Sequence, residues 1–148
     1  MVNARPEVFR DALSKLWSVP LNASNADAFW SVLDPALDEL SPVQRGKFGG
    51  EGTRASVASY FLFVADPVRQ PFYRPHFGGK AITWLYGNDR LDGRSLGHLL
   101  TDYIGRCTYL QREFKDAGLP LEDMIDTQSA LYILVDQYLK VARPKRNG

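Results

Sequence analysis

Residues 71–87 read PFYRPHFGGKAITWLYG, and no other window of the chain holds as much aromatic surface beside as many polar hydrogen-bonding groups. Pro75 favours extended backbone in the residue before it and can itself occupy the first turn of a helix. We therefore predict a helix that begins at Pro75 and ends at Gly87. It runs through the apolar residues Phe77, Ala81, Ile82, Trp84 and Leu85.

Two helices are predicted near the N-terminus. Apolar residues recur from Val8 to Trp17 with the spacing of one helical face, and Pro6 can occupy the first turn of this helix. The first helix should stop before Pro20. Asn22 or Ser24 can cap the second helix, because short polar side chains accept hydrogen bonds from free N–H groups. We expect these two helices to form an antiparallel pair.

Pro35 lies inside the pattern of the second helix. A proline removes a backbone donor and clashes with the previous turn, so we predict a kink or a break there. Asp34 would then cap a short helix that runs to Leu40. The next residues, 41–52, read SPVQRGKFGGEG and hold four glycines and a proline, so they are predicted to form the longest internal loop.

Thr53 can cap a third helix whose apolar residues lie on several faces, which is typical of a central position. A β-strand over residues 59–64 is the competing interpretation, because a short aromatic and branched run is ambiguous by periodicity alone. Helix is favoured, since no second strand is evident that could pair with it.

Two further helices are predicted in the C-terminal third. A long helix extends from about Arg94 to Ala117, with Gly118 as its stop. The last helix begins near Leu121 and has a bend near Asp126. The chain is therefore expected to be an all-α protein, a single compact bundle of about five to seven helices over residues 1–142. Residues 143–148 are expected to form a basic, mobile tail.

The composition excludes several classes of protein. A length of 148 residues fits one domain, and 45% hydrophobic with 24% charged residues fits a folded one. The net charge of +1 gives no overall field that would attract nucleic acid. Cys107 is the only cysteine, so no internal disulfide is possible, and one cysteine with two histidines is too few for an ordinary zinc site. No apolar run reaches membrane-spanning length, and a cytoplasmic protein is expected.

Basic side chains alternate with aromatic ones in and around residues 71–87. Such a mixture can hold nucleic-acid phosphates while an aromatic face stacks on a base. Several of these aromatics are spaced to face a core, so this surface can also be a packing junction. The candidate binding residues are Tyr73, Arg74, His76, Lys80 and Arg90.

Candidate catalytic groups are sparse. His76 could act in acid–base chemistry if a carboxylate distant in sequence oriented it, whereas His98 is interpreted as a packed side chain. Gly78, Gly79 and Lys80 do not form a phosphate-binding loop, because Ala81 stands where Ser or Thr is required. Acidic residues before the last two helices are interpreted as helix caps. No catalytic set, metal site or cofactor is expected.

Three segments carry a family resemblance: residues 60–73, YFLFVADPVRQPFY; residues 74–87, RPHFGGKAITWLYG; and residues 118–134, GLPLEDMIDTQSALYIL. They resemble helical regions that accompany McrB-like AAA+ ATPases and nucleases in bacterial defence and restriction proteins. There, an LxDP…(Y/F)P…KP(T/R) element precedes a RDxIDxQSxLW helix. The matching positions are Leu62, Asp66, Pro67, Pro71, Pro75, Asp123, Met124, Ile125, Asp126, Gln128, Ser129 and Leu131. The chain departs from the pattern at Arg74, where Lys is expected, and at Tyr132, where Trp is expected.

The resemblance implies an accessory module or an excised domain rather than the motor, because no ATPase motif is present in this sequence. The leading hypothesis is a non-catalytic helical module of a bacterial defence or nucleic-acid-processing system. Its target would be nucleic acid. Its partner would be an AAA+ ATPase or a nuclease, either as a separate protein or as a domain fused to this chain. The first alternative is a protein-interaction or dimerisation module without nucleic-acid contact. The second alternative is a small hydrolase or nuclease that uses His76.

Overall fold

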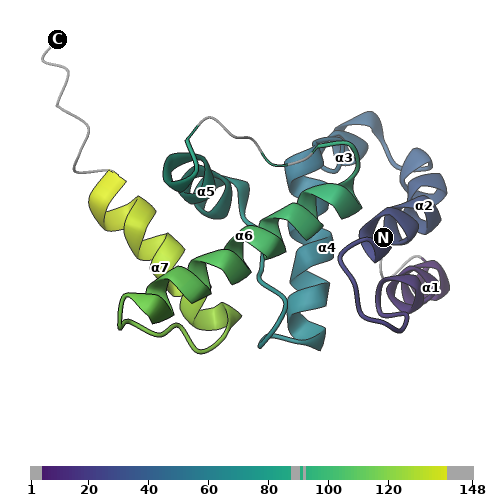
Figure 1. The fold of residues 1–148 in the computed structure, drawn as a ribbon. Helices are drawn as coiled ribbons and strands as arrows, with labels where there is room; N and C mark the ends of the chain where they lie inside the picture. Colours follow the sequence, from purple (N-terminus) through teal and green to yellow (C-terminus); the bar gives the residue numbers. More distant parts are fainter. Residues whose placement is uncertain (1–4, 88–90, 92, 140–148) are drawn as a thin grey trace, which may run out of the picture.

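The computed structural model describes residues 5–87, 91 and 93–139, and every regular element in these ranges is helical. Figure 1 shows the path of the chain. The predicted all-α class is confirmed. The elements are α1 (Pro6–Leu16), α2 (Asn25–Asp38), α3 (Pro42–Gly46), α4 (Glu51–Ala65), the π-helical turn η1 (Pro75–Gly79), α5 (Lys80–Leu85), α6 (Leu96–Asp116), α7 (Met124–Ile133) and the π-helical segment η2 (Leu134–Leu139).

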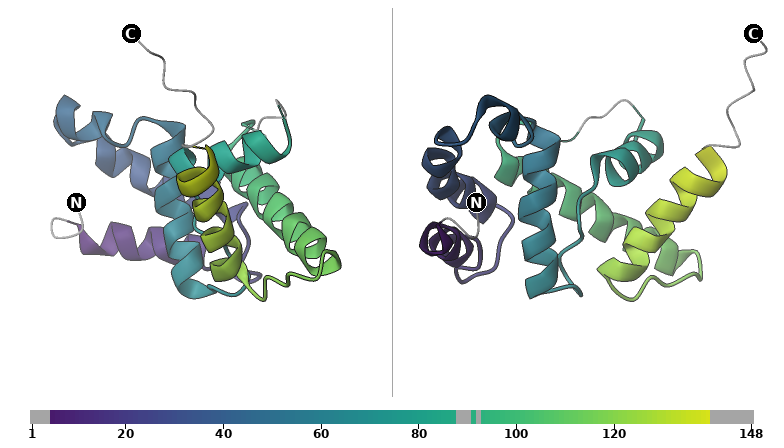
Figure 2. Two further views of the ribbon diagram at one scale, coloured as in Figure 1. Left: turned by 90° about the vertical axis from the view of Figure 1, so that its left-hand side faces the viewer. Right: turned by 180° about the vertical axis from the view of Figure 1, so that it is seen from behind.

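Helices α4 and α6 cross at the centre of the bundle (Figure 1). Helices α1 and α2 pack closely on each other on one side of this crossing, and η1, α5 and α7 lie on the other side (Figure 2). One continuous core joins the two sides, because burial of apolar surface is the main force that holds helices together. Its largest fully buried side chains include Phe29, Leu33, Leu62, Leu100 and Tyr103.

Several predicted helix boundaries are confirmed by their caps. Pro6 is the first residue of α1, where its missing N–H removes no hydrogen bond. Gly118 follows the end of α6 with a φ of +78°, a conformation that suits glycine. The last helix begins later than predicted, because the carboxylate of Asp123 caps it by accepting bonds from the N–H groups of Ile125 and Asp126.

The prediction at Pro35 was a kink or a break, and a break is wrong, since α2 is continuous through this residue. Leu33 and Leu37 are both buried, so packing on the core compensates for the hydrogen bond that proline removes. Asp34 does not cap a new helix. Its carboxylate accepts bonds from the Arg54 guanidinium at 2.6 and 3.2 Å, which joins α2 to α4.

The predicted loop at 41–52 is shorter than expected. Ser41 and Gln44 form a capping box that starts the short helix α3, and α4 already begins at Glu51 with Gly50 as its N-cap. The residues after Pro75 start as the π-helical turn η1 and continue as α5, which ends at Leu85. The competing strand over residues 59–64 is wrong, because these residues lie within α4. The tail at 143–148 lies outside the described residues.

Within the described ranges, no helix combines the length and the apolar character that crossing a membrane requires.

Candidate functional site

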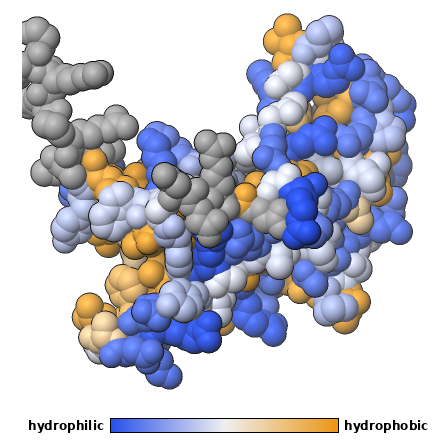
Figure 3. All heavy atoms as spheres, turned by 45° about the horizontal axis from the view of Figure 1, so that its top comes forward, coloured by the Kyte–Doolittle hydropathy of each residue, from blue (hydrophilic) through white to orange (hydrophobic). Residues whose placement is uncertain are grey.

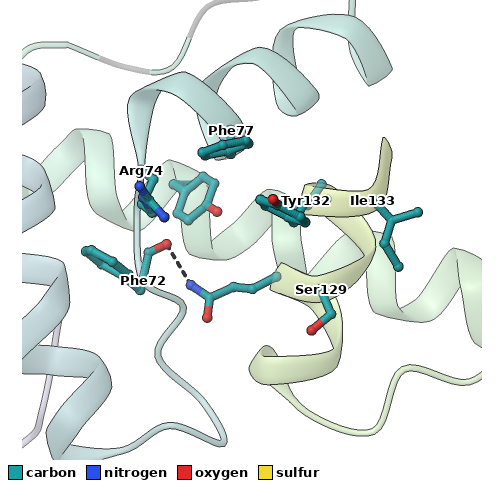
Figure 4. Close-up of a pocket in the computed structure, with 10 residues that line it drawn as sticks. Phe72, Arg74, Phe77, Ser129, Tyr132 and Ile133 are labelled. Atoms are coloured by element: carbon teal, nitrogen blue, oxygen red, sulfur yellow. Dashed lines mark hydrogen bonds between the residues drawn. The ribbon is translucent and has the colours of Figure 1, made fainter. Parts of the chain in front are cut away.

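A partly open pocket of about 330 Å³ lies between the start of the 71–87 stretch and α7. Figure 4 shows one wall formed by Phe72, Arg74 and Phe77 and the other formed by residues of α7. The α7 residues that line the pocket include Ser129, Tyr132 and Ile133.

Two long-range hydrogen bonds bring these walls together. The backbone N–H of Met124 donates to the carbonyl of Val68 at 3.1 Å, at the start of α7. One turn further along, the side-chain amide of Gln128 donates to the carbonyl of Phe72 at 2.6 Å, the dashed line in Figure 4. Segments far apart in the sequence, which are also two of the segments that carry the resemblance, therefore meet at the pocket.

The walls of the pocket are mainly aromatic. The rings of Phe77 and Tyr132 face each other with centroids 4.9 Å apart and an interplanar angle of 40°. The Arg74 guanidinium carbon lies 5.1 Å from the centroid of Phe77, within the range of a cation–π contact. Phe72 also packs edge-on against Tyr60 of α4, at 5.7 Å. The pocket thus offers apolar faces and one cation to an incoming group.

Tyr103 of α6 forms the buried part of the lining and is 1% exposed. Its ring packs against Tyr73 with centroids 4.9 Å apart. Gly78 lies directly against its hydroxyl, because a Cβ at this position would come within 2.5 Å of Tyr103 Oη. The absence of a side chain at Gly78 therefore lets η1 approach α6 closely.

Cys107 lies one turn beyond Tyr103 on α6 and is fully buried. Burial raises the pKa of its thiol to about 12, and the hydrogen bond with Tyr103 offsets this rise only in part. Burial also raises the pKa of the Tyr103 hydroxyl well above its usual value. Both groups therefore stay neutral in the core.

The Cys107 thiol should be unreactive in the folded protein. The thiolate is the reacting form, so we expect a disulfide reagent at a pH of about 8 to label Cys107 only after unfolding in urea. Between a pH of about 8.5 and about 12 the Cys107 thiol keeps its proton in the folded chain but loses it in the unfolded chain. The free energy of unfolding should therefore fall as the pH rises above about 8.5. Rapid labelling without urea, followed by absorbance, would contradict both the burial and the raised pKa.

The structure separates the five candidate binding residues. Arg74 lines the pocket, but Tyr73 is buried, and its backbone N–H donates to the Ser59 hydroxyl at 3.0 Å. His76 and Lys80 are exposed on η1 and at the start of α5, outside the pocket lining. Arg90 lies outside the described residues.

The described residues do not assemble a catalytic centre around His76. Its ring packs edge-on against Phe77 at 5.1 Å, and none of the hydrogen bonds or ion pairs between described residues joins His76 to a carboxylate. Across the same ranges, no group of three or more His, Cys, Asp or Glu side chains is arranged to hold a metal ion.

The sequence interpretation missed the contribution of α7. This helix buries Met124 and Leu131 but also exposes Ile125, Tyr132 and Ile133, at 46%, 48% and 50%. A helix that is apolar on more than one face needs a partner on each of those faces. The spacing of residues 125, 132 and 133, at i, i+7 and i+8, was the signal that could have revealed the second face.

Exposed apolar side chains continue beyond α7. On the face drawn in Figure 3, hydrophobic residues reach the surface at several separate places, some of them on the left-hand side, which holds α5 and α7. On the other side of the pocket, Phe72 packs against Tyr60 of α4, which is also exposed. Exposed aromatic side chains, Tyr132 and Tyr60, therefore lie on the two sides of the pocket.

In comparisons with protein-family models, curated proteins and solved structures, the chain matches none of them. The resemblance to regions that accompany McrB-like proteins therefore stays a prediction from short motifs.

Proposed function

We propose that this chain is a non-catalytic docking module that binds a protein partner at the pocket between residues 72–78 and α7. An apolar or aromatic side chain of the partner would enter the pocket, and the exposed face of α7 would pack against the rest of the partner segment. The observation that carries this proposal is the aromatic pocket opening beside an exposed apolar helix face.

Three physical arguments support docking. Exposed apolar patches on a folded domain are costly in water and commonly mark interaction surfaces. Interfaces are dominated by a few anchors that fill well-packed pockets, and aromatic walls suit such anchors. The cavity of about 330 Å³ is at the lower end of the range for small-molecule sites, which fits a single large side chain better than a large cofactor.

The wider setting follows from the resemblance. We propose that the partner belongs to a cytoplasmic bacterial defence or nucleic-acid-processing assembly, such as an AAA+ ATPase or a nuclease. Nucleic acid itself is the second candidate ligand, because the Arg74 guanidinium over Phe77 could accompany a stacked base. A strand also needs several cations for its phosphates, and Arg74 is the one Lys or Arg among the described residues that line the pocket.

A random-peptide library selected against the folded chain tests the proposal. We expect enriched peptides to share an aromatic or large apolar anchor and to bind the Tyr132→Ala variant at least about tenfold more weakly, because this change removes one wall of the pocket. Tyr109→Ala is the matched control, since Tyr109 is 45% exposed and Tyr132 is 48% exposed. Affinities are measured by fluorescence anisotropy.

Two outcomes would contradict protein docking. One is enrichment of peptides that bind the wild-type chain and both variants equally. The other is a lack of enrichment while labelled single-stranded DNA or RNA binds with a Tyr132-dependent affinity that falls steeply with salt, which would favour the nucleic-acid candidate instead.

A further inference from the structure

The C-terminal part of the described chain has a one-sided charge. Residues 119–139 contain four carboxylates and no Lys or Arg, although the whole chain has a net charge of +1. The four are Glu122, Asp123, Asp126 and Asp136. The described segment that exposes the apolar face of α7 therefore carries negative charge only.

Helical register places acidic groups beside this apolar face. Ile125, Tyr132 and Ile133 lie at i, i+7 and i+8, so they form a stripe along one face of α7 that the polar side chains of Gln128 and Ser129 interrupt. Asp126 precedes Ile133 by two turns, so it lies along the edge of the stripe. Glu122 is exposed just before the helix, where its backbone N–H donates to the Asp126 carboxylate at 3.0 Å.

We propose that the partner segment is a basic amphipathic helix that packs along α7. Its apolar side would cover the stripe and place one large side chain in the pocket, while its Lys or Arg side chains would lie near Glu122 and Asp126. This inference rests on the proposed docking function and adds the chemistry of the partner. Opposite charges at the rim of an interface steer encounter and exclude partners of the wrong sign.

A helix is the form of partner that fits this surface best. The ten residues of α7 extend for about 15 Å, which matches about three turns of a partner helix. Helices pack by fitting side-chain ridges into grooves, and an amphipathic helix can lay its apolar face on such a surface. Charge does not favour a second copy of this chain as the occupant, because residues 119–139 offer no Lys or Arg that could pair with the carboxylates of another copy.

Two synthetic helical peptides test the inference. They share one apolar face with a single Trp anchor and differ only in their flanking charges, which are Lys in one and Glu in the other. We expect the Lys peptide to bind at least about tenfold more tightly by fluorescence anisotropy. Replacing Glu122 by Gln and Asp126 by Asn should weaken that peptide about threefold to tenfold and flatten its salt dependence. The same exchanges at Glu7 and Asp11 on α1 are the control.

The outcomes separate the inference from the function on which it rests. Equal affinity for the two peptides, or no effect of the Glu122 and Asp126 exchanges, would overturn the basic partner. If the Glu peptide binds the wild-type chain more tightly than the Lys peptide does, and binds the Tyr132→Ala variant more weakly, the docking function is supported and the basic partner is contradicted. If the Lys peptide binds Tyr132→Ala as well as the wild type, docking at this pocket falls too. A concentration-dependent mass in light scattering that Ile133→Glu abolishes would assign the surface to a second copy.

Discussion

Tyr103→Ala should lower the free energy of unfolding by about 3–5 kcal/mol, as other truncations of large buried side chains do. Tyr103 is 1% exposed, packs on Tyr73 and lies against Gly78, so its removal opens a cavity where α6 meets η1. It also takes away the hydroxyl partner of the Cys107 thiol. Urea unfolding followed by circular dichroism measures the loss.

Tyr109→Ala is the matched control for this prediction. Tyr109 lies on the same helix and is 45% exposed, so its truncation should change the free energy of unfolding by less than about 1 kcal/mol. Equal losses for the two variants would mean that the contact between α6 and η1 contributes little to stability. The pocket would then lack the rigid base that Tyr103 provides.

Gly97→Ala should lower the free energy of unfolding by about 1–3 kcal/mol, because it overpacks a close contact between α6 and α2. A Cβ at Gly97 would lie 2.8 Å from Ser24 Cα and 2.6 Å from Asp27 Oδ2. The Ser24 contact is with backbone, so no simple rotation of a side chain relieves it. The shift would also disturb the bonds of 3.2 Å that the Gly97 N–H donates to the Asp27 carboxylate.

Gly105→Ala provides the control on the same helix. A Cβ at Gly105 would meet no described atom within 4 Å, and alanine favours helix more than glycine does. We expect this variant to be more stable than the wild type by roughly 0.5–1 kcal/mol in the same urea titration. If Gly97→Ala were as stable as Gly105→Ala, the close approach of α2 and α6 would not exist in solution.

The all-α class followed from features that act locally. Proline at the start of α1, glycine after α6 and apolar residues at helical spacing each report on the backbone near them. The break predicted at Pro35 did not occur, because the outcome there depends on burial of Leu33 and Leu37 against distant elements. The helix α3 was not predicted, because the four glycines of residues 41–52 favour a loop, whereas Ser41 and Gln44 form a capping box that starts a helix.

The site was less accessible to sequence reasoning than the fold. Arg74 was predicted as a binding residue and lines the pocket, but its neighbours across the pocket come from α7, and the bond that joins Gln128 to Phe72 spans 56 residues. Such a contact leaves no local pattern. Tyr73 was interpreted as a binding residue because aromatic side chains can stack on ligands, but burial against Tyr103 makes it part of the core instead.

The hydrogen bonds from Met124 and Gln128 to the carbonyls of Val68 and Phe72 have a consequence for the kinetics of recognition. They hold the two walls in place before a partner arrives, so association requires little ordering of the backbone and loses little conformational entropy. Competing partners should therefore differ mainly in how long they stay bound, since dissociation rates carry most affinity differences at a preorganised surface.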